Sequence, residues 1–208
     1  MPCGLRYKAS PPMETLLTID RELFLLLNGL HATWLDPIMA FCSGKITWIP
    51  LYLLLLYAVW RRLSWKGLLV FLLAAGLMVL LADQGSVLIK NLVQRPRPCH
   101  APELAGLVHL PNGRCGGAYG FVSSHASNVF ALALLASLVV RNSLWTCGLF
   151  LWAVLVSYSR IYMGVHYPGD VLCGALLGLV AGTIAWAIFR LLRRRLLPCR
   201  CVCGGRKC

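Results

Sequence analysis

The sequence predicts an all-α fold, a polytopic transmembrane helical bundle with five to six spans. The first observation is composition, since 59% of the 208 residues are hydrophobic and the mean hydropathy is +0.72. The second is charge, because only 13% of the residues are charged, against about 25% in an ordinary soluble domain. The third is a series of long apolar runs. No room remains for a separate soluble domain, so we expect a single domain over residues 1–208.

Five of these runs are long enough to cross a bilayer, which takes about 20 residues of helix. Each is too long to be a strand. They cover residues 40–60, 67–88, 119–140, 144–162 and 168–190. Lys45 and Pro50 lie in the first run, so its outer half is expected to be irregular.

Residues 14–36 mix leucines with Glu14, Asp20, Arg21, Glu22 and Asp36. This pattern is typical of an N-terminal amphipathic helix that lies at the membrane interface. A sixth span over residues 22–43 is the alternative. No apolar stretch followed by a small-residue cleavage site precedes this segment, so no removable signal peptide is expected.

Basic residues predict the orientation, because cytoplasmic connections are enriched in lysine and arginine. They gather at three predicted helix ends: Arg61, Arg62 and Lys66; Arg141; and Arg190, Arg193, Arg194 and Arg195. We expect these ends in the cytoplasm, followed by a basic, cysteine-rich tail over residues 191–208. The connection 89–118 and the turn before residue 168 are then external. This distribution accounts for the net charge of +13 without a nucleic-acid partner.

Three polar clusters fall at the predicted external ends. They are Lys90-x6-Arg97-Pro98, Ser123-Ser124-His125 and Ser159-Arg160-x5-His166-x3-Asp170. Charged side chains beside hydrophobic helices are costly and are rarely present without a function. Their common location at one membrane face favours a single site.

The composition of these clusters suits phosphate chemistry. Lys90, Arg97 and Arg160 supply positive charge, and arginine suits bidentate contact with phosphate oxygens. Ser123 and Ser124, at the start of a predicted helix, add hydroxyl and backbone donors where the helix end favours an anion.

Two histidines have distinct predicted roles. His166 lies four residues before Asp170, so the carboxylate can orient the imidazole for attack on phosphorus. His125 suits the general acid that protonates the leaving oxygen. A metal site is the alternative for a His–Asp pair, but no third ligand has suitable spacing. The cysteines of the tail also lack a standard zinc spacing; they are Cys199, Cys201, Cys203 and Cys208.

These clusters resemble the three signature motifs of the type 2 phosphatidic acid phosphatase (PAP2) superfamily, which also includes the vanadium haloperoxidases. The family pattern is K-x6-R-P, then P-S-G-H, then S-R-x5-H-x3-D. The first and third motifs match in full. In the second, Val122 and Ser124 stand where the family has proline and glycine. The resemblance covers residues 85–170.

The resemblance implies a phosphohistidine intermediate on His166, with Asp170 orienting it and His125 as the acid. It implies that phosphate is held by Lys90, Arg97, Ser123, the amide of Ser124 and Arg160. No metal or other cofactor is required. The hydrophobic spans fit the bacterial membrane lipid phosphatase branch and argue against the soluble haloperoxidases.

The external connection carries two further predictions. Cys99 and Cys115 could form a disulfide closing a loop of about 17 residues, which contributes about 3 kcal/mol in the chain-entropy model. Two free thiols are the alternative. Side chains expected to contact the lipid headgroup are Arg95, His100 and Arg114, with His109 and Asn112 also in this loop.

We therefore expect a metal-independent lipid phosphatase of the bacterial inner membrane, with its active site facing the periplasm. Undecaprenyl pyrophosphate and lipid A phosphate are the leading substrates. The alternatives are phosphatidylglycerol phosphate or phosphatidic acid as substrate, or a non-catalytic lipid-phosphate binding or transport protein. The sequence makes no prediction of the oligomeric state.

Overall fold

The computed structural model describes residues 11–111 and 113–197, and this part of the chain is helical, as predicted. Its α-helices are α1 (Pro11–Gly29), α2 (Asp36–Ser43), α3 (Ile49–Val93), α4 (Ser124–Val140), α5 (Ser143–Tyr162) and α6 (Pro168–Leu196). Short 3-10 turns cover Ile46–Trp48, Pro98–His100 and Pro102–Leu104. Among the described residues the only β pairing is an isolated bridge between Pro96 and Tyr119.

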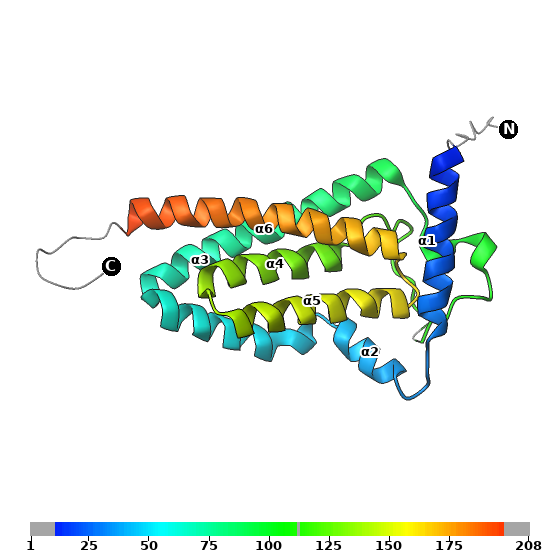
Figure 1. The fold of residues 1–208 in the computed structure, drawn as a ribbon, viewed down its shortest axis with the longest axis horizontal. Coiled ribbons are helices and arrows are strands. Elements are labelled where there is room, and N and C mark those ends of the chain that lie inside the picture. Colours follow the sequence, from blue (N-terminus) through cyan, green and yellow to red (C-terminus); the bar gives the residue numbers. More distant parts are fainter. Residues whose placement is uncertain (1–10, 112, 198–208) are drawn as a thin grey trace, which may run out of the picture.

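The apolar helices form the bundle. Three stretches of helix are long and apolar enough to cross a membrane, namely Ile46–Val93, Ser143–Tyr162 and Pro168–Leu196, and α4 is a shorter apolar helix. The first of these contains two predicted spans, because its backbone leaves the helical conformation at Ser64 (φ 69°, ψ 175°). Figure 1 shows the chain turning back at this break.

Two predicted span boundaries were wrong. Residues 40–43 of the first predicted span belong to the separate helix α2, since the chain leaves the helical conformation at Gly44. The third span begins at Ser124 rather than at 119, because residues 119–122 are held beside the preceding loop by the Pro96–Tyr119 bridge. α3 also continues to Val93, where Gln94 adopts a left-handed conformation ahead of Pro96.

The N-terminal helix α1 lies across one end of the bundle rather than along it (Figure 1). It is amphipathic: Phe24 and Asn28 are buried against the bundle, whereas Leu16 and Leu26 are more than half exposed. This arrangement agrees with an interfacial helix and excludes the alternative span over residues 22–43, because the chain leaves the helix after Gly29.

Close packing of α6 on α4 determines where the polar clusters meet. Gly174, Gly178 and Gly182 form one face of α6, and a side chain at any of them would collide with the α4 backbone at Ser123, Ser127 or Ala131. Small residues at this spacing allow helix backbones to approach closely. As a result, the N–H of Ser123 donates to the carbonyl of Asp170 at 2.9 Å, so the starts of α4 and α6 are joined.

Enlarging this glycine face is expected to destabilise the bundle. Gly178→Ala places a methyl group against the Ser127 backbone, and overpacking of this kind costs about 1–3 kcal/mol. We expect a lower midpoint of thermal unfolding in detergent. Gly148→Ala on α5 is the matched control, since nothing lies within 4 Å of its added methyl group. Equal stability of the two variants would contradict the packing argument.

Candidate active site

The three polar clusters converge at the end of the bundle covered by α1. Each site residue lies at or near a helix terminus: Lys90 and Arg97 at the end of α3, Ser123 to His125 at the start of α4, Arg160 at the end of α5, and His166 and Asp170 around the start of α6. The charges interact across these elements. His125 is influenced by Arg97, Arg160 and His166, and Lys90 by Arg97 and Asp170.

A positively charged hollow of about 330 Å³ opens beside these residues. Its lining includes Arg97, Arg114 and Arg160, together with Ser43 of α2, and no carboxylate. The guanidinium Nη1 of Arg160 donates to Ser43 Oγ. Its Nε is buried without a hydrogen-bond partner in the protein. An unsatisfied buried donor is unfavourable, so the site suits an anion that accepts from it.

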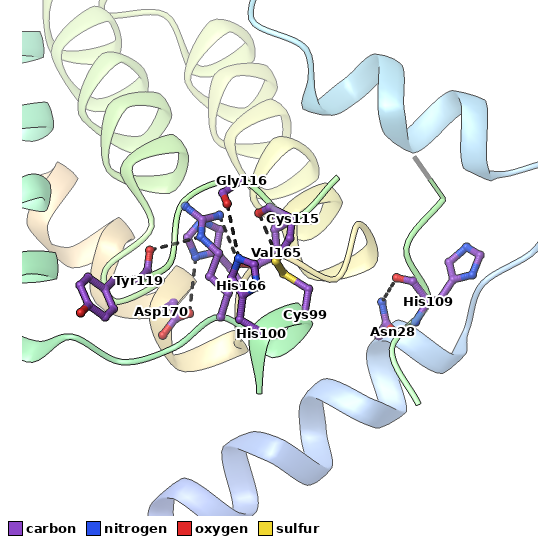
Figure 2. The surroundings of a disulfide bond; sticks show 11 residues. Asn28, Cys99, His100, His109, Cys115, Gly116, Tyr119, Val165, His166 and Asp170 are labelled. Atoms are coloured by element: carbon purple, nitrogen blue, oxygen red, sulfur yellow. Dashed lines mark hydrogen bonds and ion pairs between the residues drawn. A yellow bond between two sulfur atoms is a disulfide. The ribbon is translucent and has the colours of Figure 1, made fainter. Parts of the chain in front are cut away.

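The loop between α3 and α4 holds Arg97 through the backbone. Its Nε donates to the carbonyl of Tyr119 at 3.2 Å, and its Nη1 lies 3.5 Å from the carbonyl of Val165 (Figure 2). Burial lowers the pKa of Arg97, and the charge of Asp170 opposes that shift. Glycine at position 120 allows Arg97 and Asp170 to lie close to the loop backbone, because a Cβ there would lie 2.9 Å from Asp170 Oδ2.

The His166–Asp170 pair lies almost completely inside the protein. Asp170 is fully buried, His166 is 2% exposed, and Nδ1 of the imidazole lies 3.4 Å from Oδ2 of the carboxylate. That distance is long for a hydrogen bond but short enough for strong electrostatic contact. Oδ2 also accepts from the N–H of Tyr167 at 3.0 Å, which caps α6. The arrangement directs Nδ1 toward the carboxylate and leaves Nε2 for another partner.

Arg95 has a different environment from the headgroup contact expected of it. Its Nη1 binds Asp170 Oδ1 at 3.0 Å and its Nη2 binds Asp20 Oδ2 at 2.8 Å, with the side chain 16% exposed. The guanidinium also stacks on the ring of Tyr167 at 3.9 Å. Asp20 Oδ1 accepts from the N–H of Gly169 at 2.7 Å. Arg95 therefore ties α1 to the carboxylate beside His166.

Asp20 was missed as a site residue by sequence reasoning. It was counted only as one of the charges on an amphipathic helix. The structure places its carboxylate on the face of α1 that packs on the bundle, in contact with Arg95 and Gly169. A charge on the buried face of a helix was the available signal. Ser43 and Lys45 were also missed, because they lie outside the motifs. Ser43 Oγ accepts from Arg160, and the charge of Lys45 acts on His125.

The two serines of the second cluster face different partners. The Ser124 hydroxyl accepts from Lys90 Nζ and lies 2.6 Å from Ser86 Oγ, so the side chain that replaces the family glycine is accommodated against α3. Ser123 is fully buried and caps α4, accepting from the N–H of Ala126 at 3.4 Å. The first turn of α4 has N–H groups without helical partners, which suits an anion.

The remaining headgroup candidates are dispersed over the loop. Arg114 is exposed and lines the hollow. His100 is exposed, with Nε2 3.4 Å from the carbonyl of Gly116. His109 packs elsewhere: its Nε2 lies 2.9 Å from Asp36 Oδ1 and its ring stacks on His31 at 3.8 Å. Asn112 lies outside the described residues.

Cys99 and Cys115 lie side by side at the mouth of the hollow. Their Cα atoms are 5.9 Å apart and their sulfur atoms are at bonding distance. Figure 2 shows them with His100 and the loop that carries His166. Together with His100 they form the one group of three metal-ligating side chains within reach of one ion in the described part of the chain. A disulfide between the two cysteines would leave no thiolate for a metal. The tail cysteines lie outside the described residues.

The environment of His166 predicts an unusual titration. Burial lowers the pKa of this imidazole to about 4, although Asp170 opposes the shift. An unperturbed histidine titrates near pH 6.5, so His166 is expected to remain neutral as the pH falls from 8 to 5. Histidine-labelled NMR of the detergent-solubilised protein measures this, with His166→Gln to assign the signal. A midpoint at 6 or above would contradict it.

Comparison with known proteins identifies the family. The profile of the PAP2 superfamily matches residues 67–194. The chain is 38% identical to lipid A 4'-phosphatase of Bacteroides thetaiotaomicron over 187 residues, covering 88% of this chain and 83% of that protein. It is 30% identical to undecaprenyl-diphosphatase BcrC of Bacillus subtilis over 185 residues, covering 84% of this chain and 86% of that protein.

A solved structure shows the same architecture. The crystal structure of Aquifex aeolicus LpxE superposes with a TM-score of 0.63 at 26% identity, covering 81% of this chain and 95% of that one. The helical fold and the membrane-spanning helices agree with the expectation from composition and apolar runs. The matched family agrees with the expectation from the three motifs. The chain belongs to the PAP2 superfamily and is a multi-pass membrane lipid phosphatase, a hydrolase of phosphoric esters.

Proposed function

We propose that this enzyme removes phosphate from a lipid phosphate or pyrophosphate through a phosphohistidine intermediate on His166. The observation that carries the proposal is the hollow lined by Arg97 and Arg160, with a buried and unpartnered Arg160 Nε, beside the buried His166–Asp170 pair. Lys90, Arg97, Arg160 and the start of α4 would bind the phosphate oxygens. Preorganised donors of this kind stabilise the charge that develops in the transition state.

In the first step, His166 Nε2 attacks phosphorus as the bond to the lipid oxygen breaks. The leaving oxygen takes a proton from His125, which the bound phosphate anion holds in its protonated imidazolium form, and the phosphoryl group remains on His166. Asp170 beside Nδ1 stabilises the positive charge that the imidazole acquires. Because burial keeps the free His166 neutral, its electron pair is available near pH 7.

In the second step, water attacks the phosphohistidine and the nitrogen–phosphorus bond breaks. His125, now neutral, accepts the proton of the attacking water. Inorganic phosphate leaves, and both histidines return to their starting states. Each step uses only groups of this chain and water, so the reaction is expected to proceed in the presence of a chelator.

Lipid A phosphate is the leading substrate, and undecaprenyl pyrophosphate is the second. The first rests on 38% and 36% identity to lipid A 4'-phosphatases of Bacteroides thetaiotaomicron and Porphyromonas gingivalis, each over more than four-fifths of this chain. The second rests on the lower identity to BcrC. We expect Arg114, which lines the hollow, and His100, beside Gly116 of its lining, to contact the remainder of the headgroup.

We also propose that the enzyme lies in the bacterial inner membrane with its active site facing the periplasm. The support is the basic character of the opposite end of the bundle, which the positive-inside rule assigns to the cytoplasm. An oxidising periplasm would allow Cys99 and Cys115 to form a disulfide that closes residues 99–115 of the loop, next to Arg97. Alkylation before and after reduction, read at Cys99 and Cys115 by peptide mapping, tests this pairing, and labelling of these two thiols without reduction would exclude it.

Phosphate release from a lipid panel tests the function. Detergent-purified protein in EDTA would be given lipid A, undecaprenyl pyrophosphate, phosphatidylglycerol phosphate and phosphatidic acid. We expect release by the wild type, most from lipid A, and none above background from His166→Ala. The exposed His31→Ala, which the site does not include, is the control for a general effect of losing a histidine. Release that needs a divalent metal, or that survives in His166→Ala, would overturn the mechanism.

Loss of the Asp20 carboxylate is expected to slow the reaction without weakening lipid binding. Asp20→Asn frees Arg95 to shift, and with it Asp170 and His166. Misplacing a reacting group by about 1 Å costs roughly a hundredfold in rate, so we expect kcat to fall at least tenfold with KM little changed. Glu22→Gln, an exposed carboxylate on the same helix, is the control. Equal kcat in the two variants would exclude a positioning role for Asp20.

A further inference from the structure

The end of the bundle remote from the active site carries positive charge without a neutralising partner. Its cations are Arg61, Arg62, Lys66, Arg141, Arg190, Arg193, Arg194 and Arg195. All seven side-chain carboxylates of the chain lie elsewhere, at residues 14–36, 83, 103 and 170. Asp83 is 17 residues beyond Lys66 on α3, a distance of about 25 Å along a helix. No ion pair of the described residues involves these cations.

Two hollows lie among these cations, one on each side of α6. The first, about 530 Å³, lies between α4 and α6 and is lined by Arg141, Arg190 and Arg193. The second, about 570 Å³, lies between the break in α3 and α6. Its lining includes Lys66 and Arg194, together with Arg190 and Arg193 of the first hollow. Both contain Phe189 as well. Each exceeds the volume of the hollow at the active site.

The charge in these hollows exceeds what the local backbone can neutralise. The ends of α4 and α6 point here, and a helix C-terminus contributes only about half a negative charge. Five exposed cations line the two hollows, and an anion bound between them would relieve their mutual repulsion. The positive-inside rule explains why such cations occur at this end. It does not explain their convergence on two hollows that share Arg190 and Arg193.

We propose that this basic cleft, formed by Lys66, Arg141, Arg190, Arg193 and Arg194, binds the phosphate headgroup of an acidic phospholipid. Basic pockets between transmembrane helices commonly bind such headgroups. The apolar wall supports a lipid over a free anion: Trp186 and Phe189 line the first hollow, and Arg190 stacks on Trp186 at 4.7 Å. Phosphate groups would contact the arginines while the acyl chains extend along the exposed apolar surface of α6, which includes Leu176, Val180 and Ile184.

Native mass spectrometry and thermal unfolding of the purified protein test this site. The probes are phosphatidylglycerol and cardiolipin, with phosphatidylcholine as the uncharged comparison and inorganic pyrophosphate as the free anion. The test variant is Arg190→Gln/Arg193→Gln, which removes the two shared arginines. The matched control is Arg62→Gln/Arg195→Gln, which removes the same charge from the same end but from residues that line neither hollow. All these proteins keep the active site, so any phosphate binding there is common to them.

We expect the acidic lipids to be retained by the wild type and the control and to raise their unfolding temperature. The affinity of the test variant should fall roughly tenfold or more, since each cation near the surface contributes to binding acidic lipid. Equal losses in the two double variants would show non-specific attraction to the charged end and overturn the proposal. Stabilisation by pyrophosphate that equals that by the lipids and is lost in the test variant would show a simple anion site instead.

Discussion

The buried carboxylate of Asp170 is the group on which the active site depends. It is fully buried, and its three interactions connect separate elements: Arg95 from the loop after α3, His166 from the turn after α5, and the backbone at the start of α6. A buried charge is tolerated only when it is paired and hydrogen-bonded. The requirement to satisfy this one carboxylate therefore determines the positions of Arg95 and, through Arg95, of Asp20 on α1.

The helix packing brings the backbone to the position that this carboxylate needs. The glycine face of α6 lies directly on α4, so that the carbonyl of Asp170 accepts from Ser123 and the start of α4 is held beside His166. Larger side chains on that face would separate the second and third motifs. The catalytic arrangement and the closest helix contact in the bundle are therefore parts of the same feature of the fold.

The two ends of the molecule show how charge is distributed along a membrane protein. At the active-site end Arg95 is paired with Asp20 and Asp170, and the buried Nε of Arg160 remains available for a phosphate. At the other end no side-chain carboxylate of the described residues lies among the cations. Both ends are suited to phosphate groups, but the first also has the two histidines that we propose as catalytic, and the second has an apolar wall. The difference between a catalytic and a binding site lies in these neighbouring groups.

The sequence alone determined the class of fold and most of the chemistry. Hydropathy depends on the run of apolar residues along the chain, so the bundle and its apolar segments could be predicted without any tertiary information. The motifs were informative because His166 and Asp170 are one helical turn apart, and the start of α4 could be recognised close to Ser123. Segment boundaries failed where a local backbone break was needed, at Gly44 and before Ser124.

Only the tertiary structure decided the partners that are distant in the sequence. Asp20 and Arg95 are 75 residues apart and meet because α1 lies across the bundle. A sequence pattern shows that a residue is charged but does not show which charged residue will be its partner. The same applies to Ser43 with Arg160, and to the cleft between the break in α3 and the end of α6. Local periodicity is a property of the chain, whereas ion pairs between helices depend on how the helices pack. The glycine face of α6 and the buried carboxylate of Asp170 determined that packing.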